Sequence, residues 1–233
     1  MDKQAVRERV WDELEDSGVA RFPFPPHGRI PNFAGADEAA DRLAGLPEWE
    51  QADAIKSNPD SPQRPVRKRA LAAGKTVYMA VPRLRDEACF VRLDPATIDD
   101  YDRASTISGS SEVGEQVGPD DVDAIDLVVS GSVAVTEDGA RIGKGEGYSD
   151  LEYAVLRELG LVDDATPVAT TVHERQVVAE AVPVADHDVP MDLVVTPDRV
   201  IRPTGEYAKP SGIAWQKLSE ERIEEIPVLQ RFR

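Results

Sequence analysis

Residues 139–150 place closely spaced glycines and two cations directly before a helical pattern: Gly139-Ala-Arg141-Ile-Gly143-Lys144-Gly145-Glu146-Gly147-Tyr148-Ser149-Asp150. Apolar side chains follow at helical spacing from Leu151 to Leu159. Alternate glycines let a backbone approach a ligand closely, and the free amides of a helix N-terminus attract anions. The segment therefore predicts a polyphosphate site, although a flexible turn between a strand and a helix would account for the same composition equally well.

The spacing excludes the two common phosphate-binding motifs. A Walker A loop has four residues between its first glycine and Gly-Lys-Ser/Thr, whereas three residues separate Gly139 from Gly143, and Lys144 is followed by glycine. The dinucleotide fingerprint G-x-G-x-x-G also fails, because the pattern from Gly143 is G-x-G-x-G. A nucleotide site at this loop must be of another type.

Asp150 has two possible functions. A carboxylate near a helix start is ordinary, because it complements the helix dipole. Beside a phosphate it would be repulsive unless Mg²⁺ lay between the two groups, held by carboxylate and phosphate oxygens. The residues alone favour the helix-start interpretation.

Apolar, β-branched runs alternate with helical patterns on both sides of the loop. Strand–helix alternation predicts an α/β fold, a three-layer α/β/α sandwich with a mostly parallel sheet. The proline-rich segment 22–32 predicts an extended loop, and the polar residues 102–121 predict a long surface loop. Strands are expected at 52–56, 76–81, 90–93, 125–129, 133–135, 168–172, 193–195 and 200–201, and helices at 3–16, 36–45, 65–73, 151–159 and 218–223.

Composition restricts the partners and the compartment. The net charge of −17 argues against nucleic acid and anionic membranes as partners. No run of eighteen apolar residues could span a bilayer, and the N-terminus lacks the apolar core of a signal peptide, so we expect a cytoplasmic protein. The single cysteine, Cys89, rules out a disulfide framework within the chain.

The cations are mostly arginine, with 7 Lys against 20 Arg. A lysine-poor, acid-rich surface suggests a halophilic, high-salt cytoplasm, where ions screen the self-repulsion. The one dense basic run, from Arg64 to Arg69, predicts a solvated helix face. A folate glutamate tail or RNA are the alternatives for this run.

The glycine loop resembles the signature of the 5-formyltetrahydrofolate cyclo-ligase family, roughly R-L-G-x-G-x-G-Y-Y-D, over residues 141–150. The opening segment from Asp2 to Arg7 is similar to the family's first helix, with Lys3 and Arg7 four residues apart. The segment 182–196 looks like the family's Asp-containing stretch before its last strand. The resemblance covers most of residues 1–202, so 203–233 are expected to be a C-terminal extension packed on the same domain.

The resemblance implies a fold of the ribose-phosphate-isomerase and CoA-transferase type. It also implies ATP- and Mg²⁺-dependent cyclisation of 5-formyltetrahydrofolate, a reduced folate, to 5,10-methenyltetrahydrofolate. Mg²⁺ would be bound by Asp150 and Asp188, and the folate by Asp60 and residues 145–148. ATP would be bound by Lys3, Arg7, Arg141, Gly143, Lys144, Gly145, Glu146, Gly147 and Tyr148.

A narrower likeness points to the branch of this family called methenyltetrahydrofolate synthetase domain-containing. It is carried by residues 29–33, 56–60, 82–85, 131–135 and 145–153. Three features depart from the enzyme pattern: Ser149 replaces the second tyrosine, Leu151 replaces an arginine, and residues 58–63 replace an acidic stretch. The alternative is therefore a non-catalytic ATP- or folate-binding homologue that acts through a partner or on another reduced pterin.

Overall fold

The computed structural model describes residues 2–205 and 207–233. Within them, the central sheet has the spatial order β13 (Val200–Ile201), β12 (Leu193–Val195), β10 (Val168–Thr171), β7 (Leu127–Val129), β3 (Ala54–Ser57), β4 (Thr76–Ala80), β5 (Phe90–Leu93) and β6 (Glu115–Val117). The strands from β12 to β4 run parallel, and the outer pairs are antiparallel. The predicted mostly parallel sheet is thus confirmed.

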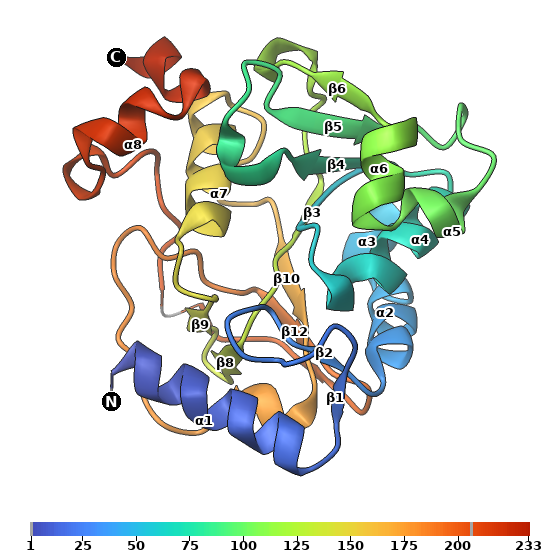
Figure 1. Cartoon of the computed structure of the whole chain (residues 1–233), viewed down its shortest axis with the longest axis vertical. Helices are drawn as coiled ribbons and strands as arrows, with labels where there is room; N and C mark the ends of the chain where they lie inside the picture. Colours follow the sequence, from blue (N-terminus) through green and yellow to red (C-terminus); the bar gives the residue numbers. More distant parts are fainter. Residues whose placement is uncertain (1, 206) are drawn as a thin grey trace.

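Helices cover both faces of this sheet (Figure 1). Alternate side chains of β7 point to opposite faces: Leu127 and Val129 join one apolar core, while Val128 joins the other. The first core includes α2 (Ala36–Ala44), α3 (Pro47–Gln51) and α4 (Arg64–Ala72). The second includes α7 (Tyr148–Glu158) and α8 (Glu220–Glu224). Two cores on one sheet make the predicted three layers.

A smaller unit lies at the N-terminal helix (Figure 1). Helix α1 (Lys3–Asp16) buries one apolar stripe, including Val6, Val10 and Leu14, in a third core. That core also contains residues of a sheet made of β11 (Val177–Val178), β8 (Ala134–Thr136) and β9 (Arg141–Ile142). The short hairpin of β1 (Ala20–Arg21) and β2 (Asn32–Phe33) encloses the proline-rich loop, which is irregular as expected.

The prediction of a long loop at 102–121 is wrong. The segment contains most of α5 (Tyr101–Ala104), then α6 (Ile107–Val113) and β6. Its serines and glycine are poor helix formers, but side-chain caps offset this: Asp100 accepts from the Arg103 amide at 3.0 Å, and Thr106 accepts from the Gly109 amide at 3.0 Å. Helix α7 also begins three residues earlier than expected.

Some apolar side chains beyond residue 202 contact the second core. Ile213, Ile223 and Leu229 belong to the same core as Val155 of α7. The Lys209 ammonium donates to the Thr166 carbonyl at 2.7 Å and pairs with Asp192 at 2.7 Å. Cys89 is fully buried. Within the described chain, no helix has the length and apolarity needed to cross a bilayer.

Candidate functional site

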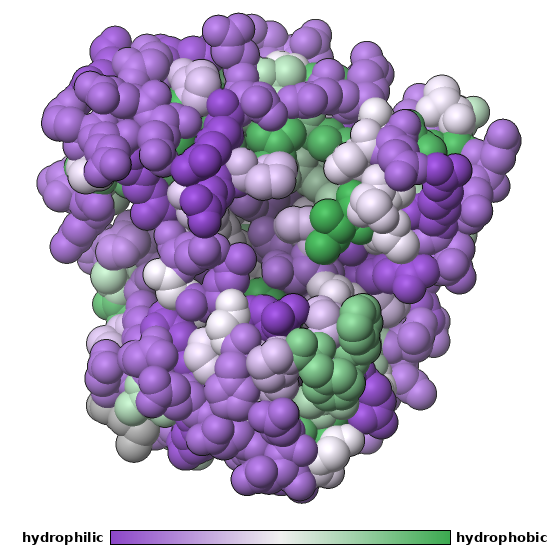
Figure 2. All heavy atoms as spheres, in the orientation of Figure 1, coloured by the Kyte–Doolittle hydropathy of each residue, from purple (hydrophilic) through white to green (hydrophobic). Residues whose placement is uncertain are grey.

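A cavity of about 410 Å³ opens where β3, β4 and β7 end. Carboxyl ends of parallel strands are the usual place for a ligand in an open α/β sheet. The walls come from the segments 58–60, 79–83, 107–111 and 141–152. Figure 2 shows the corresponding hollow on this face of the molecule, edged by both polar and apolar side chains.

Eight of the twelve predicted site residues line this cavity: Asp60, Arg141, Gly143, Lys144, Glu146, Gly147, Tyr148 and Asp150. The lining does not include Lys3, Arg7, Gly145 or Asp188. Gly145 belongs to the glycine loop itself, Arg7 contacts the loop from outside the cavity, and Lys3 pairs with Asp188 in the segment beside it. The predicted site residues therefore divide into those that line one pocket and those that support it from outside.

The glycine loop connects β9 to α7 and requires glycine at two positions. Gly145 has φ +107° and Gly147 has φ +69°, both in the left-handed region that side chains disfavour. Gly147 is the N-cap residue of α7, so Tyr148 begins the helix and the first-turn residues Tyr148, Ser149 and Asp150 face the cavity. The free amides of this helix start can therefore meet an anionic ligand.

Two cations of α1, Lys3 and Arg7, hold this loop and the neighbouring Asp188 segment in place. Arg7 donates from Nε to the Gly143 carbonyl at 2.7 Å, and Lys3 pairs with the Asp188 carboxylate at 2.6 Å. A Cβ atom at Gly145 would lie 3.4 Å from Cζ of Arg7, so the loop backbone passes closely over the guanidinium. The first helix thus positions the loop from behind.

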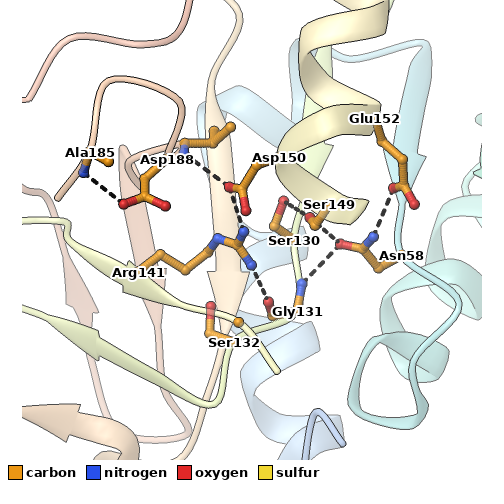
Figure 3. A network of polar contacts seen from close by, with 12 residues as sticks. Asn58, Ser130, Gly131, Ser132, Arg141, Ser149, Asp150, Glu152, Ala185 and Asp188 are labelled. Atoms are coloured by element: carbon orange, nitrogen blue, oxygen red, sulfur yellow. Dashed lines mark hydrogen bonds and ion pairs between the residues drawn. The ribbon is translucent and has the colours of Figure 1, made fainter. Parts of the chain in front are cut away.

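Asp150 and Asp188 lie close together but are both engaged (Figure 3). Oδ1 of Asp150 accepts from Arg141 at 2.6 Å and from the Val189 amide at 3.0 Å. Oδ2 of Asp188 accepts from Lys3 and from the Ala185 amide at 2.8 Å. Each carboxylate keeps one oxygen outside these bonds.

Arg141 is buried and uses its two terminal nitrogens for protein contacts, while its Nε has no partner within the described chain. Besides Asp150, it donates to the Gly131 carbonyl at 2.9 Å, and it is 6% exposed. It thereby links the end of β7 to the first turn of α7. Lys144 is the more accessible cation of the loop and pairs with Glu146 at 2.8 Å, a contact that lowers the pKa of Glu146.

A buried polar network below the loop was not predicted (Figure 3). Glu152 forms an ion pair with Lys56, and both side chains are less than a tenth exposed. Asn58 donates to Glu152 at 3.1 Å and accepts from the Gly131 amide at 3.1 Å and the Ser149 hydroxyl at 3.2 Å. The available signal was a run of polar residues, 56–58, completing an otherwise apolar strand.

Asp60 occupies the cavity wall opposite the loop. Burial raises the pKa of its carboxyl, while Lys144 acts in the opposite direction. Its Oδ2 and the Oε1 of Gln63 both face Gly131, each 3.1 Å from where a Cβ atom would stand. Gln63 Oε1 is buried and has no partner within the described chain. Asp60 therefore presents a carboxylate to the cavity, whereas Gln63 is fully buried and is not part of the lining.

The basic run 64–69 is only partly the solvated face that was expected. Arg64 and Lys68 pair with Asp102 at the surface. Arg67, by contrast, is 1% exposed and donates to the carbonyls of four residues, and burial lowers its pKa to about 10. Those carbonyls belong to Asn58, Pro59, Asp60 and Ser105.

In the described part of the chain, no three His, Cys, Asp or Glu side chains gather into a group that could hold a metal ion. Mg²⁺ needs fewer protein ligands when it binds together with a nucleotide, because phosphate oxygens and water complete its shell. Asp150 and Asp188, with one oxygen each outside their hydrogen bonds, are compatible with that shared mode.

The fold and the pocket define an α/β protein with a ligand site at the carboxyl ends of its strands, where a glycine loop meets a helix N-terminus. The chain belongs to the 5-formyltetrahydrofolate cyclo-ligase family, whose family model matches residues 2–197. This assignment agrees with the resemblance of the loop signature.

Curated relatives are similar over the whole chain. The methenyltetrahydrofolate synthase domain-containing protein of Mus musculus is 47% identical over 238 residues, covering 100% of this chain and 63% of the relative. The protein of the same name from Homo sapiens is 41% identical, covering 100% and 62%. The chain therefore spans less than two thirds of the length of these relatives.

A solved structure shares the fold. The 5,10-methenyltetrahydrofolate synthetase of Aquifex aeolicus superposes with a TM-score of 0.53 at 21% identity, covering 87% of this chain and 93% of that chain. The α/β architecture is thus that of a known methenyltetrahydrofolate synthetase.

Proposed function

We propose that this protein uses ATP and Mg²⁺ to cyclise 5-formyltetrahydrofolate to 5,10-methenyltetrahydrofolate, as a cytoplasmic enzyme. The observation that carries the proposal is the glycine loop: its left-handed glycines lead into the first turn of α7 at the wall of a cavity large enough for a small ligand. Family membership supports the substrate class.

The residues divide into three groups in this proposal. The loop residues 143–148 and the start of α7 bind the phosphates, with Lys144 as the accessible cation. Lys3 and Arg7 hold the loop and its neighbouring segment. They would add positive charge to the phosphate site if a phosphate replaced their present partners, Asp188 and the Gly143 carbonyl. Asp60 and the loop face the folate. Asp150 and Asp188 would hold Mg²⁺, which supplies charge neutralisation for the transferring phosphoryl group.

The chemistry requires mainly positioning and charge stabilisation. The formyl oxygen attacks the γ-phosphorus, ADP leaves, and an iminium phosphate forms on the folate. N10 then attacks the formyl carbon, loses its proton, and inorganic phosphate departs with the original formyl oxygen. Cations and helix amides stabilise the phosphoryl transfer, and the cavity walls keep N10 near the carbon.

The test is the absorbance of 5,10-methenyltetrahydrofolate formed from 5-formyltetrahydrofolate, ATP and Mg²⁺ in high KCl. We expect an ATP-dependent signal that falls about 100-fold or more in Asp150→Asn, since Mg²⁺ would lose one of its two carboxylate ligands and the phosphoryl transfer its charge neutralisation. Lys68→Ala, an exposed cation paired with Asp102, is the matched control and should leave turnover unchanged. No product from folded protein that binds ATP would overturn the proposal.

One observation favours a second candidate, a binding protein without cyclisation activity. Ser149 replaces the second tyrosine of the family signature, and its hydroxyl donates inward to Asn58 at 3.2 Å. An aromatic ring that could contact a ligand is therefore missing from this wall. Saturable binding of ATP and folate without an absorbance product would establish this candidate.

A further inference from the structure

We propose that Glu152 is a specificity-determining residue that recognises the N–H donor edge of the ligand's ring, namely the 2-amino and N3–H groups of a reduced pterin. The inference rests on the proposed function, because that function supplies the ring. Glu152 would thereby fix the direction in which the ligand enters the cavity. The loop signature contains neither Glu152 nor its partner Lys56.

The carboxylate of Glu152 is fixed from one side only. Oε2 receives both hydrogen bonds from below, one from the Lys56 ammonium and one from the Asn58 amide. Lys56 is 1% exposed and is not part of the cavity wall, whereas Glu152 and Asn58 are. The ion pair therefore holds the carboxylate in place with its charge at the cavity wall. Figure 3 shows the contact between Asn58 and Glu152.

The second oxygen, Oε1, remains for a ligand. No donor in the described chain bonds to it, and it is not among the buried atoms that lack a partner. An unbonded oxygen that is not sealed from solvent, on a side chain that lines the cavity, opens into that cavity. A carboxylate in an ion pair only accepts hydrogen bonds, so its ligand must present donors.

The walls around the cavity fit a flat ring. Met79, Ala80 and Val91 line the same cavity and supply apolar contact. A reduced pterin has two adjacent N–H donors on one edge of such a ring. The opposite end of a folate has carboxylates, which Glu152 and Asp60 would repel. We infer that the ring enters first and that the glutamate end stays near the mouth, where Lys144 lies.

The test measures ring recognition by binding rather than by turnover. The probes are 6-methyltetrahydropterin and its analogue without the 2-amino group, titrated calorimetrically. We expect the wild-type protein to prefer the amino compound by about 10-fold or more, as for a hydrogen bond to a charged group. In the double variant Lys56→Met/Glu152→Gln, the preference should fall to within about 3-fold. The Asn58 amide, which donates to Oε2, selects the glutamine oxygen at that position, so an N–H donor replaces Oε1 at the cavity.

The double variant removes both charges together, so no unpaired charge is left buried. Thermal unfolding checks that it folds. Glu220→Gln, which removes an exposed carboxylate paired with Arg233, is the matched control and should keep the full preference. A double variant with the wild-type preference, or a wild type without one, overturns the inference.

Further outcomes separate this inference from the proposed function. Ring discrimination without methenyltetrahydrofolate formation refutes the enzyme and keeps Glu152 in its role. Product formation without ring discrimination supports the enzyme and refutes the role of Glu152. A second pair of probes, ATP and the triphosphate lacking the 6-amino group, covers the remaining case. If the double variant changes that preference instead, Glu152 contacts adenine and the pterin assignment is wrong.

Discussion

Arg67 is buried, although the neighbouring cations Arg64 and Lys68 are exposed. It lies between surface cations, yet its guanidinium is buried and contacts backbone carbonyls only. One side of the fork binds residues 58–60, and the other binds Ser105, next to α6. Because both segments lead into the cavity walls, one side chain sets the distance between these walls.

We predict that Arg67→Lys lowers the free energy of unfolding by about 3 kcal/mol, because a single ammonium cannot reach all four carbonyls and leaves buried acceptors unpaired. Urea unfolding measures the change. Arg64→Lys, at an exposed pair with Asp102, should change stability by less than about 0.5 kcal/mol. Equal effects of the two substitutions would contradict the assigned role.

Asp60 should make stability depend on pH. Burial raises its folded-state pKa, so its contribution is complete below the unfolded value of about 3.9 and is lost as pH rises through the folded value. Asparagine does not titrate, so Asp60→Asn removes this loss of stability at higher pH. We therefore expect the variant to be more stable than wild type at pH 8, with the difference shrinking toward pH 4.

Asp138 provides a control of opposite sign. A hydrogen bond from Thr136 lowers its pKa, so its contribution is present at neutral pH and is lost as pH falls through the folded value. Asp138→Asn should be less stable than wild type at pH 8 and should converge with it in acid. Parallel pH profiles for the two variants would refute both assignments.

Sequence reasoning found the residues with a motif and missed those defined by burial. The loop from Arg141 to Asp150 has a recognisable spacing, so its position in a pocket was predictable. Glu152 and Lys56 are 96 positions apart, and their pairing depends on α7 packing over β3. No local pattern encodes that contact. Arg67 was misinterpreted because the exposure of a charged helix residue depends on which face meets the sheet.

At the scale of elements, apolar periodicity predicted the longer helices and every strand of the central sheet except β6, but it missed the short strands β1, β2, β9 and β11. It failed at α5 and α6, whose sequences are polar and contain serines and glycine. These helices exist because Asp100 and Thr106 cap them and because they pack beside α4 and β5. Capping residues can be recognised in the local sequence but stabilise a helix only weakly. Packing contacts between distant segments cannot be recognised in a short stretch of sequence.

The start of α7 tests the importance of loop geometry. Gly147→Ala places a side chain at φ +69°, where no neighbouring atom lies within 4 Å, so only backbone strain opposes it. We expect a loss of about 1 kcal/mol in stability and weaker ATP binding, measured by unfolding and calorimetry. Gly118→Ala, at φ −76°, is the control and should be close to neutral. Unchanged ATP affinity in Gly147→Ala would separate the loop from the nucleotide.

The extension beyond residue 202 acts on the loop as well as on the core. The Arg222 guanidinium lies 4.4 Å from the centre of the Tyr148 ring and donates to the Glu146 carbonyl at 2.8 Å. Residues 203–233 therefore reach one wall of the site. We propose that this extension is an integral part of the same domain, in line with its apolar contacts to α7.

For the whole molecule, the net charge of −17 predicts a salt dependence. The screening length falls from about 10 Å at 0.1 M to about 3 Å at 1 M, which weakens repulsion among the excess carboxylates. We expect the melting temperature to rise from low to molar KCl, and equally in NaCl if screening is the cause. A melting temperature indifferent to salt would remove the halophilic hypothesis.

The strand order has a consequence for synthesis on the ribosome. In the sheet, β7 lies between β3 and β10, and β10 lies between β7 and β12. The cavity gathers residues 58–60 with residues 130–152, and the support from Asp188 comes later still. A nascent chain emerging N-terminus first can therefore pair β3 with β4 early, but the other parallel neighbour of β3 is present only once β7 has emerged. The site is complete only after Asp188 has emerged from the ribosome.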